Sequence, residues 1–155
     1  MNLVGIIGKN NFSKNFKKQH MSIINITEKN IVNIKNVKFQ ILIINDNLSE
    51  FKNMLKTLEN IIKNSEYIIL NSDLDIKIDV TNFVKKKIIT FGFNPKSTVT
   101  TSSITEENIL IDLQREIITL ENNIVEPEEM LLKTNGNNDV YEKLISYSIK
   151  TILEK

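Results

Sequence analysis

The sequence predicts an α/β fold in which a mainly parallel sheet, flanked by helices in three layers, continues into a small antiparallel sheet. Two observations carry this prediction. In the first two thirds of the 155 residues, short apolar runs alternate with segments of helical spacing, as in a parallel sheet built from crossover units. After Pro95, short runs rich in β-branched residues follow one another, which is typical of antiparallel strands joined by turns. We expect residues 1–155 to form a single domain.

Apolar runs predict the strands of the parallel part. The run 3–7 ends at Gly8, the pattern of a buried strand that enters a tight turn. Residues 28–36 fit either a short helix or a strand. Further apolar runs bounded by polar residues predict strands over 22–26, 39–44, 67–70 and 88–91.

The clearest helix follows the strand at 39–44. Its apolar residues recur at a spacing of three and four, which places them on one helical face. They are Leu48, Phe51, Leu55, Leu58 and Ile62, with Met54 and Ile61 widening the stripe. Asn47 is the predicted N-cap, and Glu50 three residues later completes a capping-box pattern.

The last third predicts short antiparallel strands and a closing helix. Asn122-Asn123 has the composition of a hairpin turn. The final helix is predicted over 140–152. The preceding residues Asn135-Gly136-Asn137-Asn138 are expected to interrupt regular secondary structure. The expected strands cover 98–102, 109–119, 124–125 and 130–132.

Composition excludes several classes of function. Lys+Arg of 20 against Asp+Glu of 19 leaves a net charge of +1, so no global field draws in nucleic acid or an anionic membrane. Cysteine is absent, which excludes thiolate catalysis and disulfides. His20 is the only histidine, so a zinc site would need three carboxylates and no metal is expected. Without a signal peptide or an apolar run of membrane-spanning length, the expected location is cytoplasmic.

Three local sequences follow one another in the chain: Tyr67–Asp73, Ile88–Gly92 and Gly136–Tyr141. Together they resemble the central ATP-binding domain of Mur ligases, the bacterial enzymes that extend the peptidoglycan stem peptide. Tyr67–Asp73 resembles a family strand that ends in Asn-Ala-Asp, and Ile88–Gly92 resembles a Val-Thr-Phe-Gly strand. Gly136–Tyr141 resembles the Gly-x-His-Asn-Val-Tyr entry to the closing helix. The resemblance covers residues 38–155 and, weakly, residues 2–14. It implies the same three-layer fold.

The phosphate loop of this family is altered here. The family's first strand feeds a loop of Gly-Thr-x-Gly-Lys-Thr type, in which the lysine neutralises phosphate charge and the next hydroxyl holds Mg²⁺. The corresponding stretch keeps Gly8 but has Asn11 for the second glycine and Phe12 for the lysine. Asn71 matches the family's asparagine beside the adenine ring; the alternative is a polar residue that caps a strand end. The candidate nucleotide-binding residues are Gly8, Lys9, Asn10, Ser13 and Asn71.

We also expect the family's metal-binding segment and its two flanking domains to be absent. We therefore expect a degenerate, non-catalytic Mur-ligase-like domain with no catalytic residue and no resident cofactor, which binds a protein partner or a small ligand. The alternative is a nucleotide-binding regulator that holds ATP or ADP without hydrolysis. A residual ATP-dependent ligase is a third reading, for which no phosphate-coordinating lysine can be placed. The sequence leaves the oligomeric state open.

The remaining polar groups have ordinary interpretations. Asp73 and Asp75 fit a solvated turn better than a catalytic carboxylate pair. The clusters Lys14, Lys17, Lys18 and Lys85–Lys87 fit solvated faces, because basic residues without interleaved aromatics do not indicate nucleic-acid binding. Ser97–Ser103 predicts an exposed strand face, held by cross-strand hydrogen bonds or used as a recognition edge.

Overall fold

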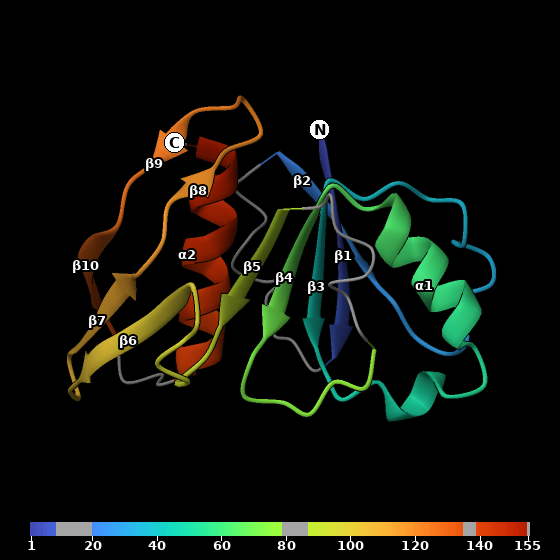
Figure 1. The fold of residues 1–155 in the computed structure, drawn as a ribbon, viewed down its shortest axis with the longest axis horizontal. Coiled ribbons are helices and arrows are strands. Elements are labelled where there is room, and N and C mark those ends of the chain that lie inside the picture. Colours follow the sequence, from blue (N-terminus) through green and yellow to red (C-terminus); the bar gives the residue numbers. More distant parts are fainter. Residues whose placement is uncertain (9–19, 79–86, 135–138, 155) are drawn as a thin grey trace. The chain divides into compact units, whose positions relative to one another are not determined.

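The computed structural model describes residues 1–8, 20–78, 87–134 and 139–154 (Figure 1). The chain divides into two compact units, Met1–Ile88 (unit 1) and Ile89–Lys155 (unit 2). Whether the two units form a single domain stays a prediction. No helix in the described ranges is long and apolar enough to cross a membrane.

Unit 1 contains a parallel sheet. Its strands are β1 (Asn2–Gly8), β2 (Met21–Asn25), β3 (Ile41–Asn45) and β4 (Tyr67–Asn71). They lie in the order β2-β1-β3-β4, and each neighbouring pair is parallel. Figure 1 shows the arrowheads of β1, β3 and β4 at the same end. The strands predicted from apolar runs are thus confirmed within a residue or two, and their carboxyl ends share one edge.

Burial explains why these strands read as continuous apolar runs. In β3, Ile41 to Ile44 are all 0% exposed, so both faces of the central strand are covered, as parallel sheets require. One face packs on helix α1 (Leu55–Asn64), since Leu42 and Ile44 share a core cluster with Leu58 and Ile62.

The helix predicted from Leu48 to Ile62 is wrong in its first half. A 3-10 helix, η2 (Ser49–Phe51), comes first, and α1 begins only at Leu55. Leu48 adopts a left-handed backbone with φ of 67°, which a right-handed helix cannot contain. Asn47 therefore does not form the predicted capping box with Glu50. The predicted buried face is nevertheless correct, because both helical segments pack their apolar side chains into the same core.

Residues 28–36 form consecutive turns, so both the helix and the strand predicted there are wrong. The Asn30 side chain holds this segment: its Oδ1 accepts from Thr27 N at 2.9 Å, and its Nδ2 donates to Asn25 O at 2.7 Å. Asparagine that bonds the nearby backbone favours turns over regular structure. Ile31, 0% exposed, anchors the turns in the core.

Unit 2 has a mixed sheet in the order β5-β6-β7-β10, together with a separate hairpin of β8 and β9. The pair β5–β6 is parallel, whereas β6–β7 and β7–β10 are antiparallel. The coarse α/β class and the antiparallel extension are therefore confirmed. The strands are β5 (Lys87–Phe91), whose first two residues belong to unit 1, β6 (Val99–Ile104), β7 (Asn108–Leu113), β8 (Ile117–Ile118), β9 (Ile124–Val125) and β10 (Glu128–Lys133).

Two local predictions for unit 2 have different outcomes. The hairpin turn is confirmed, since Asn122 joins β8 to β9 with φ of 64°, a conformation that asparagine tolerates. The exposed face predicted for 97–103 is wrong in its first half, because Ser97, Thr98 and Thr100 are buried. Their burial is tolerated because hydroxyls bond across strands, as when Thr98 N donates to Thr90 Oγ1 at 2.9 Å.

Helix α2 (Val140–Glu154) closes unit 2. Asp139 precedes its first residue, and Asp139 Oδ1 accepts a hydrogen bond from Glu142 N at 3.1 Å, an N-cap interaction. The predicted apolar stripe is confirmed by the burial of Leu144, Ile145 and Ile152.

Candidate functional site

The carboxyl edge of the unit 1 sheet is the natural place for a ligand. The chain leaves β1 for β2 on one side and returns to β3 on the other, so the connections diverge between β1 and β3. In open α/β sheets, ligands bind outside the carboxyl ends of the strands where the connections diverge in this way. The ends of β1, β3 and β4 are therefore the candidate location of a site.

Gly8 ends β1 and pairs with Asn45 of β3. It has φ of +112°, and a Cβ at this position would lie 2.3 Å from the backbone oxygen of Asn45. No side chain fits there, so the glycine is required by the close approach of two strand ends. The other phosphate-loop candidates, Lys9, Asn10 and Ser13, lie outside the described residues. Their part in nucleotide binding stays a prediction.

Asn71 ends β4 and is 1% exposed. Its Nδ2 donates to Asn45 Oδ1 at 2.8 Å, and its Oδ1 accepts from Asp73 N at 2.9 Å. The amide thereby ties β4 to β3 and starts the following turn. These bonds use the carbonyl oxygen and one of the two N–H groups. Contact with an adenine ring stays a prediction.

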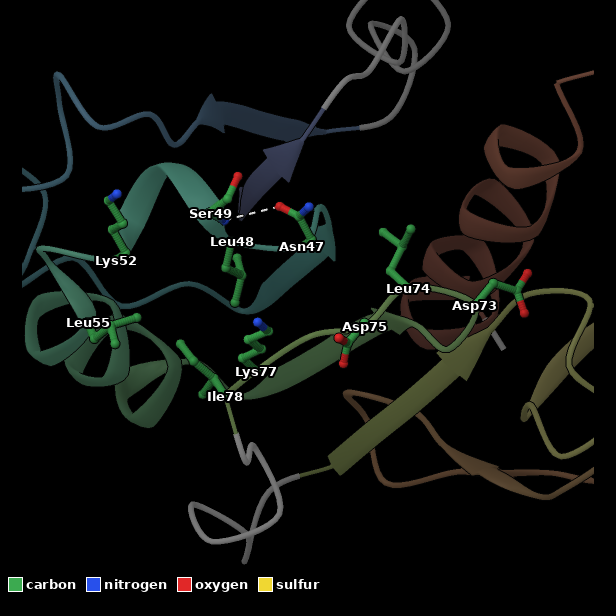
Figure 2. Close-up of a pocket in the computed structure, with 10 residues that line it drawn as sticks. All are labelled: Asn47, Leu48, Ser49, Lys52, Leu55, Asp73, Leu74, Asp75, Lys77 and Ile78. Atoms are coloured by element: carbon green, nitrogen blue, oxygen red, sulfur yellow. Dashed lines mark hydrogen bonds between the residues drawn. The ribbon is translucent and has the colours of Figure 1, made fainter.

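A cavity of about 590 Å³ opens next to these strand ends. One wall is the connection after β3 and the other is the segment after β4 (Figure 2). Its volume falls within the range of roughly 300–1,000 Å³ that is typical of small-molecule sites. The described residues that line it are Asn47, Leu48, Ser49, Lys52, Leu55, Asp73, Leu74, Asp75, Lys77 and Ile78.

The first wall is held by two consecutive side chain–backbone turns. Asp46 Oδ1 accepts from Leu48 N at 2.8 Å, and Asn47 Oδ1 accepts from Ser49 N at 3.0 Å. These bonds keep Leu48 in its left-handed conformation, which costs a residue with a Cβ about 1–2 kcal/mol. Burial of its side chain, 4% exposed, offsets that cost. The wall is thus held by hydrogen bonds within its own segment.

The cavity combines a buried apolar part with a charged rim. Leu48 and Ile78 are buried, whereas the charged lining residues are exposed. Figure 2 shows Leu55 and Asp73 at opposite ends of the lined space. The arrangement suits a small molecule that has an apolar body and charged groups of both signs. The charged residues are Lys52, Lys77, Asp73 and Asp75.

Sequence reasoning named Asp73 and Asp75 but missed Lys52 and Lys77. The two aspartates lie in an exposed turn, as predicted. A signal for the lysines existed, since each belongs to a segment that follows the carboxyl end of a parallel strand. That the two segments converge on one cavity depends on their tertiary packing, which local patterns do not encode.

A second cavity, of about 250 Å³, lies beside Gly8 and is lined in part by Asp46 and Glu50. The described part of this lining contains these two carboxylates and no lysine or arginine. The described ranges contain no group of three or more His, Cys, Asp or Glu side chains that could hold a metal ion.

The other sequence candidates lie away from this edge. His20 is exposed, and its backbone oxygen accepts from Asn2 N at the amino end of β1. Lys87 places its Nζ 4.9 Å from the ring centroid of Tyr67, the first residue of β4. The rest of both lysine clusters, Lys14, Lys17, Lys18, Lys85 and Lys86, lies outside the described residues.

Comparison with models of known protein families finds no match to this sequence. Comparison with curated proteins also finds none. The relationship to Mur ligases therefore stays a prediction that depends on the three sequence motifs.

Proposed function

We propose that this chain is a non-catalytic, Mur-ligase-like domain that binds a small ligand through unit 1. The cavity of about 590 Å³ at the carboxyl edge of the parallel sheet carries this proposal. We also propose that the whole chain has the three-layer fold of the Mur ligase central domain, and that the protein is bacterial and cytoplasmic.

The rim of the cavity favours a zwitterionic ligand such as an amino acid or a short peptide. Lys52 and Lys77 offer ammonium groups to a carboxylate, and Asp75 offers a carboxylate to an amine. Leu48 and Ile78 offer an apolar surface to a side chain. Exposed charges contribute little singly, so affinity depends on the apolar contact and on both charges being met together.

Two observations support a domain that does not catalyse ligation. Formation of an acyl phosphate concentrates negative charge, which needs cationic groups and Mg²⁺. Phe12 stands where the resembling family has its phosphate lysine. Beside Gly8, the described lining carries Asp46 and Glu50, whose charge has the wrong sign for holding a phosphate.

The second candidate is a regulator that holds an adenine nucleotide without hydrolysing it. The observation in its favour is the position of Gly8 and Asn71 at the ends of parallel strands, next to the point where the connections diverge. The two candidates differ in ligand chemistry and in the residues that they need.

Thermal denaturation of the full chain separates the two candidates. The panel contains free amino acids and dipeptides, matched amines and carboxylates that each carry one of the two charges, and ATP, ADP and UDP-sugars with and without Mg²⁺. The proposal expects a saturable rise in Tm with zwitterions that exceeds the rise with either single-charge analogue. Lys77→Glu should abolish this rise. Lys56→Glu, an equal charge change at an exposed α1 position outside the cavity lining, should preserve it.

Other outcomes contradict the proposal in distinguishable ways. A flat response to every zwitterion overturns ligand binding at this cavity. A saturable nucleotide response that disappears in Asn71→Ala establishes the regulator instead. Phosphate release above the protein-free blank, lost on substitution of Lys9 or Lys14, overturns the non-catalytic part.

A further inference from the structure

Strand β10 presents an open edge in unit 2. It pairs with β7 on one side and ends the strand order, so the described strands leave its other side unpaired. Leu131, in the middle of β10, is 62% exposed. An edge strand with an exposed apolar centre is a template for pairing with another chain.

The backbone of β10 directs alternate residues to this open edge. Thr134 N donates to Glu107 O at 2.7 Å, and these residues continue the β10–β7 register beyond Lys133 and Asn108. The even-numbered residues of β10 therefore turn their N–H and C=O groups toward β7. Because these groups alternate along an antiparallel strand, Glu129, Leu131 and Lys133 direct theirs to the open edge.

The side chains of these three residues are also exposed. Two copies of one strand can pair antiparallel about a two-fold axis. When odd-numbered residues of one copy lie opposite odd-numbered residues of the other, their side chains lie on the same face of the joined sheet. With Leu131 on the axis, Glu129 opposes the partner's Lys133, and Lys133 opposes the partner's Glu129. Opposite charges thus flank an apolar centre, an arrangement that stabilises cross-strand pairs.

The backbone groups fit the same register. The Leu131 pair on the axis and the two pairs of Glu129 with Lys133 are hydrogen-bonded pairs, which gives about six N–H···O bonds across the edge. A shift that instead places Met130 on the axis brings Pro127 opposite the partner's Lys133. Proline has no N–H to donate, so this register loses a hydrogen bond. Glu129 would also lie opposite the partner's Leu131 and lose its charge pair with Lys133. The register centred on Leu131 is therefore favoured.

We propose that β10 pairs antiparallel with β10 of a second copy of this chain, so that two copies form a symmetric dimer through a continuous sheet. A contact that uses the same patch on both chains closes on itself and forms no fibre. The self-complementary charge pattern Glu129–Leu131–Lys133 selects a second copy as the occupant. This proposal is independent of the ligand site in unit 1.

Sedimentation velocity of the full chain over a concentration series tests the dimer. The wild-type chain should pass from monomer to a species of twice the mass as its concentration rises. Glu129→Lys and Lys133→Glu each place like charges opposite one another and should weaken the dimer at least tenfold in Kd. The double variant restores opposite charges and should return Kd to within about threefold of wild type. Glu121→Lys, an equal change at an exposed turn residue, should leave Kd unchanged.

Two further variants report on the register itself. Leu131→Pro removes an N–H at the open edge but none that bonds β7, so it should give a folded monomer by circular dichroism. Leu131→Cys, in a chain without cysteine, should be cross-linked to a second copy by a short bis-maleimide, which spans the Cβ separation of a hydrogen-bonded pair. Ile118→Cys, exposed on β8, should not be cross-linked. A monomer at every concentration overturns the proposal. Failure of the charge-swapped double variant to recover, or equal cross-linking of both cysteine variants, overturns it as well.

Discussion

Tyr147 couples the stability of unit 2 to high pH. It is 4% exposed, and its hydroxyl donates to Glu128 Oε1 at 2.8 Å. Burial raises its pKa above the ordinary value, and the hydrogen bond to Glu128 raises it further. The unfolded chain therefore releases this proton as pH passes about 10, while the folded chain keeps it. This stabilisation is present below the unfolded pKa and is lost as pH rises toward the folded pKa.

We expect the free energy of unfolding to fall as pH rises above about 10, and to fall less steeply in Tyr147→Phe. Urea titrations at a series of pH values measure the slope. Burial also raises the pKa of Tyr67, so the double variant with Tyr67→Phe should have a slope that is smaller still. Equal slopes for wild type and Tyr147→Phe would show that the phenol is not responsible.

Gly8 and Gly5 offer a comparison within one strand. A Cβ on Gly8 meets backbone at 2.3 Å and a positive φ, whereas a Cβ on Gly5 meets side-chain atoms of Ile26 and Phe39 at 3.0 Å. Side chains shift more easily than paired backbone. We therefore expect Gly8→Ala to lose about 2–4 kcal/mol of unfolding free energy, and Gly5→Ala to lose less.

Chemical denaturation of both alanine variants checks this order. Because the loss comes from strand packing, it should be present in buffer without nucleotide. A Gly8→Ala variant as stable as wild type would contradict the close approach of β1 and β3.

At the scale of elements, the N-cap of α2 makes a measurable contribution to the free energy of unfolding. Asp139 Oδ1 accepts from Glu142 N, which satisfies one of the free N–H groups of the first turn. Asp139→Ala should cost about 1 kcal/mol of stability, whereas Asp139→Asn should retain most of it, because asparagine caps helices as well. Thermal and urea denaturation give both values. Equal losses in the two variants would point to the charge rather than the hydrogen bond.

The elements differ in how far the sequence predicts them. Apolar runs predict β1, β3 and β4, since strands buried on both faces need no polar alternation. The spacing at Leu48–Ile62 predicts the buried face but not the break, because the Asp46 side chain competes locally with the helical backbone. Periodicity reports burial, and the dihedral angles within a buried segment follow from such local bonds.

The candidate site shows the same limit. Gly8 and Asn71 can be named as candidates from the sequence, because each stands in a short motif at the end of a predicted strand. Lys52 and Lys77 are ordinary surface lysines in the sequence, and they become candidates only when two loops converge on one cavity. Convergence of loops is a long-range property, which a local pattern cannot supply.

At the scale of the whole molecule, the two proposals assign separate tasks to the two units. Ligand binding involves the loops 46–55 and 73–78 of unit 1, and dimerisation involves β10 of unit 2. Hydrogen exchange of the full chain reports on both at once, because backbone amides are protected where hydrogen bonds form or solvent access is lost. Sites that act independently should respond to different variables.

We expect a rise in protein concentration to slow exchange in peptides that contain Glu129, Leu131 and Lys133, with no change in the unit 1 loops. A bound zwitterion at fixed low concentration should slow exchange in the two loops and leave β10 unchanged. In Glu129→Lys, the concentration effect should move to at least tenfold higher protein concentration while the ligand effect remains. In Lys77→Glu, the ligand effect should vanish while the concentration effect remains. If the ligand protects β10 in the dilute monomer, or if dimerisation protects the loops, the two sites are coupled. The separation of tasks between the units would then be wrong, even where each site alone behaves as proposed.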